Sequence, residues 1–305
     1  MKKITGSFPG AAGLCDIRFY AYSPEKPKAA VMLSHGMCEY VEMYEEFARF
    51  LCENDIALCG NDHIGHGGSV IGEAMLGYFG YDKGYIHMVR DLHRMKMICA
   101  RLFPDIPHFL FAHSMGSFLG RIYLAKYPDE WRGAIFAGTA GGVLGQVPIR
   151  STVDGLVKKY GGHYRHRNVT KTALGVFNLR YKNRRTRYDW LSRDEEAVDR
   201  FNTDPRCNFT FTLAGYRDML NALMCANSES VFAATPTNVP ILLLGGGMDP
   251  VGEYGHGPRA ACIDYLKHGC DASVRIYPEA RHMLLAELNK QEVMEDILEF
   301  LIKRI

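Results

Sequence analysis

Short apolar runs alternate along this chain with stretches whose apolar residues recur at helical spacing. Before residue 140 the apolar runs and the helical stretches follow one another in the order 29–34, 44–51, 56–59, 85–103, 108–112, 115–127 and 133–137. Strands that alternate with helices form βαβ units, and the strands of such units lie parallel in one sheet. The sequence therefore predicts an α/β fold with a mostly parallel central sheet flanked by helices.

The same alternation returns near the carboxyl end, where two strands and two helices are expected in the order 240–244, 259–268, 273–277 and 290–303. Residues 16–22 alternate polar and apolar side chains, as a strand at the edge of a sheet does. Between the two regions, residues 142–238 lack this rhythm and contain long polar and aromatic stretches. We therefore expect one core, formed by residues 1–141 and 239–305, that is interrupted by an inserted, mainly helical lid.

Charge is distributed unevenly between the insertion and the rest of the chain. The chain carries 36 Lys and Arg against 34 Asp and Glu, and this net charge of +2 is too small for a protein whose main partner is a nucleic acid. The insertion holds 15 basic and nine acidic residues, a net of +6, which leaves −4 elsewhere. Five of its basic residues are Arg180, Lys182, Arg184, Arg185 and Arg187. They are typical of a solvated basic face, and the alternative is transient contact with anionic lipid head groups or a membrane surface.

The cysteines and the start of the chain bear on its location. Nine cysteines without a C-x-x-C pair favour free thiols over a disulfide framework. The first residues carry two lysines with no apolar stretch behind them, so no secretory signal is expected. No apolar run approaches the roughly 18 residues that a membrane span needs. We expect a cytoplasmic protein, and the sequence gives no indication of its oligomeric state.

A serine stands where one expected strand meets the next helix, in residues 109–117, FLFAHSMGS. Ser114 on such a tight turn presents its hydroxyl to solvent, and the small residues Ala112 and Gly116 let strand and helix approach closely. Ala112 replaces the more usual glycine. The helix N-terminus supplies free N–H groups and a positive dipole end, which suit a developing oxyanion. The alternative is an ordinary turn with a capping serine.

A serine hydroxyl is a weak nucleophile until a base takes its proton, so a carboxylate and a histidine are expected later in the chain. Asp249 follows the apolar run at 241–244 in a glycine-rich loop, and His282 follows the strand expected at 273–277. We predict that Ser114, Asp249 and His282 are catalytic. A turn aspartate and a surface histidine are the alternatives.

Two further loops contain candidate groups. The loop at residues 33–40, LSHGMCEY, is placed to supply a second oxyanion donor, and we assign the two donors to the backbone N–H groups of Met37 and Met115. His35 is expected to order this loop. His63 and His66 have the look of a metal pair, but their glycine-rich surroundings and the lack of a matching Cys or carboxylate cluster indicate a structured turn. We expect no metal and no cofactor.

Five sequence blocks occur in order along the chain: SHGMCEY at 34–40, NDHIGHGGS at 61–69, AHSMG at 112–116, GMD at 247–249 and ARH at 280–282. Together they resemble the α/β-hydrolase superfamily and, within it, the monoacylglycerol lipase and lysophospholipase-like group of serine hydrolases. The resemblance implies that Ser114 is the nucleophile, Asp249 the orienting acid and His282 the general base. It also implies that the backbone at Met37 and Met115 forms the oxyanion hole.

The resemblance further implies a serine carboxylic-ester hydrolase, which cleaves a single acyl chain from a monoacylglycerol or lysophospholipid-like ester through an acyl-enzyme on Ser114. A general short-chain esterase or thioesterase and a serine aminopeptidase are the alternatives, and the complete serine, aspartate and histidine set argues against a non-catalytic binding protein. Ile64, where an arginine is often found, and the bulky Met37 depart from the family pattern and bear on the shape of the acyl pocket.

The insertion is rich in apolar side chains that suit either an acyl channel or a plain helical core. They are Phe177, Leu179, Tyr181, Tyr188, Trp190, Leu191, Phe201, Phe209, Phe211 and Leu213. The expected partner is a small, lipid-like ester.

Overall fold

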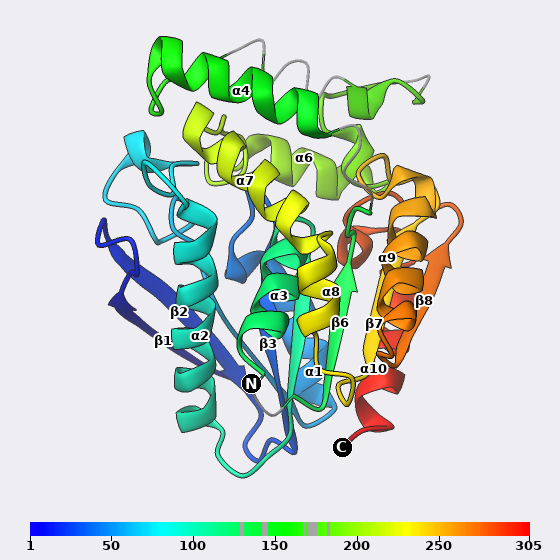
Figure 1. Ribbon diagram of the computed structural model, residues 1–305. Coiled ribbons are helices and arrows are strands. Elements are labelled where there is room, and N and C mark those ends of the chain that lie inside the picture. The colour runs from blue at the N-terminus through cyan, green and yellow to red at the C-terminus, as the bar shows by residue number, and fades with distance from the viewer. Residues whose placement is uncertain (129–130, 142–145, 167–168, 170–175, 182–183) are drawn as a thin grey trace.

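The computed structural model describes residues 1–128, 131–141, 146–166, 169, 176–181 and 184–305 (Figure 1). Within them, one eight-stranded sheet has the order β1-β2-β4-β3-β5-β6-β7-β8. The β1–β2 and β2–β4 pairs are antiparallel, and the other pairs are parallel. From β1 to β8 the strands are Lys2–Pro9, Asp16–Ser23, Ala29–Ser34, Ile56–Asn61, His108–His113, Gly133–Ala137, Ile241–Gly246 and Ala272–Tyr277.

The mostly parallel sheet confirms the predicted α/β fold, with one correction at its edge. Residues 16–22 were expected to form an edge strand, but β2 lies between β4 and β1, and β1 pairs with it from Lys2 opposite Ser23 to Pro9 opposite Asp16. The first strand, KKITGSFP, escaped prediction because most of its side chains are exposed or half-buried and it has no apolar run. This polar strand protects the edge of the sheet from further pairing.

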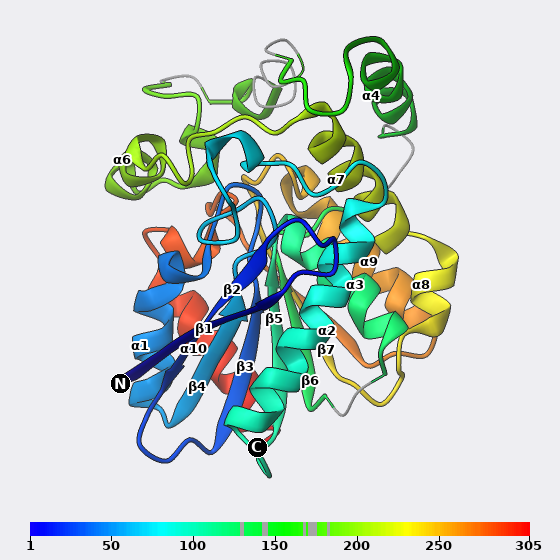
Figure 2. The same ribbon diagram turned by 90° about the vertical axis from the view of Figure 1, so that its left-hand side faces the viewer.

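Helices cover both faces of the sheet, as Figure 2 shows. On one face lie α1 (Glu45–Glu53) and α10 (Lys290–Ile302), and on the other lie α2 (Gly84–Leu102), α3 (Met115–Lys126) and α9 (His256–Lys267). In β3, Ala30 and Met32 face one apolar cluster, whereas Val31 and Leu33 face the other. Because both faces of the central strands are buried, these strands are continuous apolar runs.

The segment between β6 and β7 lies across the carboxyl ends of the strands (Figure 1). Its described helices are α4 (Gln146–Tyr160), α6 (Glu195–Thr203), α7 (Leu213–Ala226) and α8 (Glu229–Ala234). Two of them begin at capping side chains, because Asp194 accepts a hydrogen bond from the N–H of Ala197, and Thr212 accepts one from the N–H of Gly215. The segment begins after the carboxyl end of β6, so α4, α6 and α7 lie at the edge where parallel α/β folds bind ligands, whereas α8 packs beside α3.

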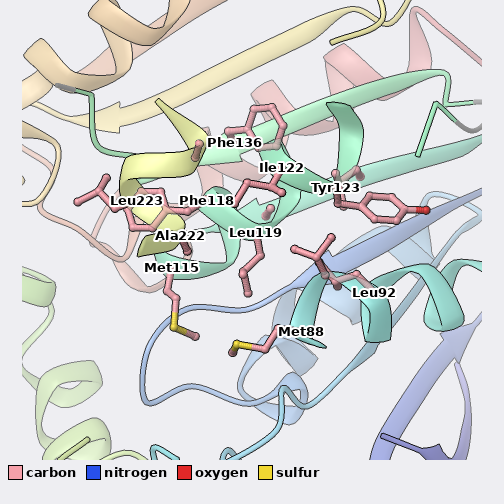
Figure 3. Packing of buried hydrophobic residues seen from close by; sticks show 14 of the residues in the cluster. Met88, Leu92, Met115, Phe118, Leu119, Ile122, Tyr123, Phe136, Ala222 and Leu223 are labelled. Atoms are coloured by element: carbon pink, nitrogen blue, oxygen red, sulfur yellow. The ribbon is translucent and has the colours of Figure 1, made fainter. Parts of the chain in front are cut away.

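Helix α3 lies at the centre of the molecule and is buried along nearly its whole length. Figure 3 shows Met88 and Leu92 of α2 on one side of it and Ala222 and Leu223 of α7 on the other. Helix α7 therefore ties the segment above the sheet to the helix that follows Ser114.

The alanine at position 112 is accommodated by a glycine in α3. A Cβ atom at Gly120 would lie 3.0 Å from the Cβ of Ala112 and 3.3 Å from Phe136, so strand and helix are in close contact there. We expect Gly120→Ala to cost more stability in the wild type than in an Ala112→Gly background, with a coupling energy of about 0.5 kcal/mol or more. Urea unfolding of the four proteins in this cycle measures it, and additive effects would contradict the compensation.

Candidate active site

Ser114 occupies a strained turn between β5 and α3. Its backbone angles are φ 51° and ψ −124°, a conformation that non-glycine residues rarely adopt. The turn is held by the N–H of Ser114, which donates to the carbonyl of Ala137 at 2.9 Å, and by the hydroxyl of Ser117, which donates to the carbonyl of Ser114 at 2.6 Å. The predicted strand-to-helix turn is thus present, with the serine at its apex.

Gly116 allows the start of α3 to pack against the loop that follows β3. A Cβ atom there would lie 2.1 Å from the carbonyl oxygen of Ser34 and 2.4 Å from that of His35, both of them backbone atoms. The Ser34 hydroxyl also donates to the carbonyl of Gly116 at 3.1 Å. The loop containing Met37 is thereby held beside the serine.

The structure brings together the three side chains that the sequence singles out as catalytic. The Nε2 atom of His282 lies 2.8 Å from the Oγ of Ser114, and its Nδ1 atom lies 3.0 Å from the Oδ2 of Asp249. Asp249 and His282 are buried. Since the carboxylate accepts the Nδ1–H, the lone pair of Nε2 faces the serine and can accept its proton.

A run of glycines brings the loops of Asp249 and His282 into contact. A Cβ atom at Gly246 would lie 2.2 Å from the carbonyl oxygen of Arg281, and one at Gly247 would lie 2.3 Å from that of Pro278. The N–H of Met248 donates to the carbonyl of Ala280 at 2.9 Å. Larger side chains at 246 and 247 would separate the carboxylate from the imidazole.

The segment above the sheet is bonded to the loop that carries His282. The N–H groups of His282 and Met283 donate to the carbonyls of Trp190 and Leu191, at 3.4 and 2.7 Å. Arg193 adds an ion pair with the buried carboxylate of Glu287 at 2.8 Å. We call residues 189–193, which contact residues 281–289, the histidine-loop strap.

A cavity of about 670 Å³ opens onto Ser114 and His282. Met37 and Met115, the residues assigned to the oxyanion hole, also line it, and Met115 is the first residue of α3, so its N–H has no acceptor within the helix. The rest of the described lining is mainly aliphatic, aromatic and methionine side chains from α3, α4, α7 and the strap. No lysine or arginine occurs among these described lining residues, and the acidic ones are Glu39 and Glu253.

The sequence pattern of the family described as serine aminopeptidase, S33, matches residues 25–289, which is most of the chain. The chain belongs to this serine aminopeptidase S33 family. The match covers the elements that carry Ser114, Asp249 and His282, as well as the segment between β6 and β7.

Similar proteins agree with this assignment. Monoglyceride lipase of Homo sapiens is 28% identical over 263 residues, which cover 86% of this chain and 78% of that protein. Monoacylglycerol lipase of Mycolicibacterium smegmatis is 24% identical over 304 residues, which cover 98% and 97%. The structure resembles a highly thermostable carboxyl esterase from Bacillus coagulans in complex with glycerol, with a TM-score of 0.93, 27% identity and 100% and 99% coverage. The predictions of an α/β-hydrolase fold, of the monoacylglycerol lipase-like group and of a serine hydrolase are confirmed.

Six of the ten side chains that suited an acyl channel line the cavity of this S33-family hydrolase: Phe177, Tyr188, Trp190, Leu191, Phe201 and Phe209. The ring of Trp190 lies 5.1 Å from that of His282. Leu179 is 72% exposed, and Tyr181, Phe211 and Leu213 are buried elsewhere. Of the two departures from the family pattern, Met37 lines the cavity, whereas the buried Ile64 is not among its lining residues.

The histidines in and near the loop at residues 33–40, called the oxyanion loop for the donor predicted at Met37, order two turns. His35 contacts the carbonyl of Gly36 through Nδ1 at 2.9 Å and accepts the N–H of His63 through Nε2 at 2.9 Å. His63 contacts the hydroxyl of Ser34, and His66 contacts the carbonyl of Ile64. Burial lowers the pKa of His63 to about 3 and that of His66 to about 4. Among the described residues, no group of three or more His, Cys, Asp or Glu side chains is arranged to hold a metal ion.

Several basic residues of the insertion interact within the protein. Arg185 pairs with Asp199 at 2.7 Å, and the guanidinium of Arg180 stacks on the ring of Tyr254 at 3.6 Å. Arg187 contacts Asn208, and Lys182 lies outside the described residues. In the part of the chain that the structure describes, none of the helices is long and apolar enough to cross a membrane.

Two ionisable residues at the site were missed in the sequence, although both stand inside the quoted blocks. Glu39 lies in SHGMCEY and His113 in AHSMG, and the Oε1 of Glu39 is 2.9 Å from the Nδ1 of His113. Both side chains are buried, and the Nε2 of His113 lies 3.2 Å from the backbone carbonyl of His282. The signal that could have identified them is an ionisable side chain inside a block that resembles the family.

Proposed function

We propose that this S33-family hydrolase cleaves a neutral monoacylglycerol-class ester, a single acyl chain on glycerol, through an acyl-enzyme on Ser114. The observation that carries the proposal is the mainly apolar cavity of about 670 Å³ that opens onto a serine within 2.8 Å of a histidine. Such a cavity is of the size that holds small molecules and offers an acyl chain apolar surface. The names of similar proteins, monoglyceride lipase and monoacylglycerol lipase, agree with it.

The proposed first step is acylation. The Nε2 of His282 takes the proton of Ser114 as Oγ attacks the ester carbonyl, and Asp249 holds the imidazole in the required tautomer. The backbone N–H groups of Met37 and Met115 donate to the oxyanion that forms on the carbonyl oxygen. When the tetrahedral species collapses, the acyl–oxygen bond to glycerol breaks and His282 returns the proton to the glycerol oxygen.

The proposed second step is hydrolysis. Water gives a proton to His282 and attacks the acyl-enzyme, the ester bond to Ser114 breaks, and the serine oxygen takes the proton back. The fatty acid then leaves. Neither step needs a group beyond the side chains and backbone already named.

The charge of the cavity favours a neutral head group. A phosphate in the substrate would lose solvation on entry, and the described lining supplies no lysine or arginine to replace it, while Glu253 adds a negative charge. A glycerol head group carries no such charge and needs only hydrogen-bonding partners. This contrast favours monoacylglycerols over lysophospholipids.

We also propose that residues 142–238 form a lid over the core of residues 1–141 and 239–305. Ile149, Val153 and Leu156 of α4 line the cavity from above, which supports this role. Ile149 is half-exposed and Leu179 is 72% exposed, and these apolar side chains support transient contact with lipid surfaces. The nine free cysteines support a reducing compartment, and we propose the cytoplasm.

A substrate panel with one acyl chain tests the function. We expect kcat/KM for the monoacylglycerol to exceed that for the matching lysophosphatidate by at least about tenfold, a difference of about 1.4 kcal/mol in transition-state stabilisation. Glu253→Gln should narrow this ratio because it removes a negative charge from the cavity. p-Nitrophenyl esters and aminoacyl anilides in the same panel test the short-chain esterase and aminopeptidase alternatives. Faster cleavage of lysophosphatidate, or cleavage of anilides alone, would contradict the proposal.

A further inference from the structure

A buried glutamate–histidine pair joins the three loops of the proposed active site. Glu39 belongs to the loop of Met37, His113 directly precedes Ser114, and the Oε1 of Glu39 lies 2.9 Å from the Nδ1 of His113. The other nitrogen of His113, Nε2, lies 3.2 Å from the backbone carbonyl of His282. The second oxygen of Glu39 accepts the N–H of Gly36 and the hydroxyl of Tyr44, each at 2.6 Å.

The surroundings of His113 determine its protonation. A neutral imidazole has one N–H group and one lone pair. In one tautomer the lone pair would face the carboxylate of Glu39, and in the other it would face the carbonyl of His282, and both of these groups are acceptors. Two protons on the ring remove this conflict. The 2.9 Å contact between Nδ1 and Oε1 then joins an imidazolium to a carboxylate.

The two pKa values support this charge assignment. Burial alone would raise the pKa of Glu39, but the charge of His113 and the hydrogen bonds that Glu39 accepts lower it to about 2. Burial alone would lower the pKa of His113, but Glu39 raises it above its ordinary value, and Asp249 adds to this effect. The ionisable side chains facing the ring are Glu39 and, across Gly138, the pair of His282 and Asp249.

A buried ion pair is a poor source of stability, because both charges lose their hydration. This pair is bonded to the backbone of two loops, because His113 contacts the carbonyl of His282 and Glu39 accepts the N–H of Gly36. We infer that Glu39 and His113 are positioning residues, a charged pair with an imidazolium at His113 that holds His282 and the oxyanion loop in register with Ser114. The inference rests on the proposed function, since it assigns the pair to the same catalytic site.

Gly138 shows how closely this arrangement is packed. Its φ is +59°, and a Cβ atom there would lie 3.1 Å from the Cε1 of His282 and 3.2 Å from the Nε2 of His113. The two histidine rings therefore lie against one backbone position, with their centroids 4.9 Å apart. A shift of His113 is transmitted to His282 without any intervening flexible side chain.

The charge is tested first, by spectroscopy. Long-range ¹H–¹⁵N spectra of the full chain between pH 6 and 8 should include a histidine with both ring nitrogens protonated throughout, and this signal should be absent in His113→Gln but present in His268→Gln, which removes the other histidine whose two nitrogens face a carboxylate and a carbonyl. Glu39→Gln should convert His113 to a neutral tautomer, because the glutamine retains acceptors for Gly36 and Tyr44 but has no charge. A neutral His113 in the wild-type protein at pH 7 would overturn the inference, whatever the substrate.

The positioning role is tested by kinetics. His113→Gln should lower kcat by about 10- to 100-fold with little change in KM, because a displaced base affects the chemical step more than substrate binding. His108→Gln is the matched control. This histidine begins the same strand, is buried, and contacts the carbonyl of Phe103 and the amine of Lys96, both at 2.9 Å. It should leave kcat within about threefold of wild type.

A His113→Gln enzyme with wild-type kcat would overturn the positioning role while leaving the proposed function intact. A wild-type chain that cleaves no ester would instead contradict the proposed function, and the spectra would still test the charged pair. If His113→Gln does not fold, Glu39→Gln supplies the same kinetic test, with a smaller expected loss because a neutral hydrogen bond replaces a charge-assisted contact.

Discussion

Ser114→Ala is expected to lower kcat for ester hydrolysis by at least about 10⁴-fold, because it removes the hydroxyl that we propose as the nucleophile. His282 and the cavity remain in place, so substrate binding should change little. The residual rate should be that of water attack aided by the oxyanion donors. Release of fatty acid from a monoacylglycerol measures the loss, and a fluorophosphonate probe followed by peptide mapping identifies the labelled residue.

Ser117→Ala is the matched control for this prediction. Its hydroxyl donates to the carbonyl of Ser114 at 2.6 Å but is no part of the proposed proton transfer. Loss of this bond should cost about 1 kcal/mol of stability and leave the label on Ser114. A label that persists in Ser114→Ala, or hydrolysis near the wild-type rate, would show that another residue is the nucleophile.

Arg121→Met is expected to lower the free energy of unfolding by about 3–5 kcal/mol, a large loss for a single substitution. Arg121 lies in α3 and is fully buried. Its guanidinium donates to Tyr265, Thr139, the carbonyls of Ala140 and Ala226, and Asn227, at distances between 2.8 and 3.4 Å. Methionine fills much of the volume but leaves these buried acceptors without their donor.

The loss of stability should appear as a lower free energy of unfolding in urea and as faster amide hydrogen exchange in one region of the fold. Ala226 and Asn227 lie at the carboxyl end of α7, so amide hydrogen exchange should increase there. Arg121→Lys should recover little, because an ammonium lacks the planar fork that reaches several acceptors. Arg132→Met is the control: the side chain of this exposed arginine contacts the carbonyl of Arg304, and a change within about 0.5 kcal/mol is expected. Equal effects at positions 121 and 132 would contradict the prediction.

The sequence predicts the sheet well where both faces of a strand are buried. The strands β3 and β5 are buried throughout and carry uninterrupted apolar runs, so neither turn preference nor register is needed to find them. The same reasoning fails for β1, whose exposed lysines and threonine give no apolar signal. Ser114 and Asp249 are visible because each follows such a run, and His282 is visible because it follows the expected strand at 273–277.

Contacts between distant segments could not be predicted in this way. Glu39 and His113 are 74 positions apart, and only the parallel pairing of β3 with β5 brings their loops together. In the sequence, nothing distinguishes Arg121 from an exposed helix residue. Its five acceptors come from three separate segments that meet only in the folded protein. A buried charge is recognisable only when its partners are known, and they depend on the complete tertiary structure.

The histidine-loop strap affects how this protein can be recombined with its relatives. Grafting a foreign insertion at residues 142 and 238 would remove the carbonyls that accept the N–H groups of His282 and Met283. It would also remove Arg193, which is the ion-pair partner of the fully buried carboxylate of Glu287. The part to exchange is therefore discontinuous in sequence. A chimera that replaces residues 142–238 should also take residues 278–289 from the same parent protein.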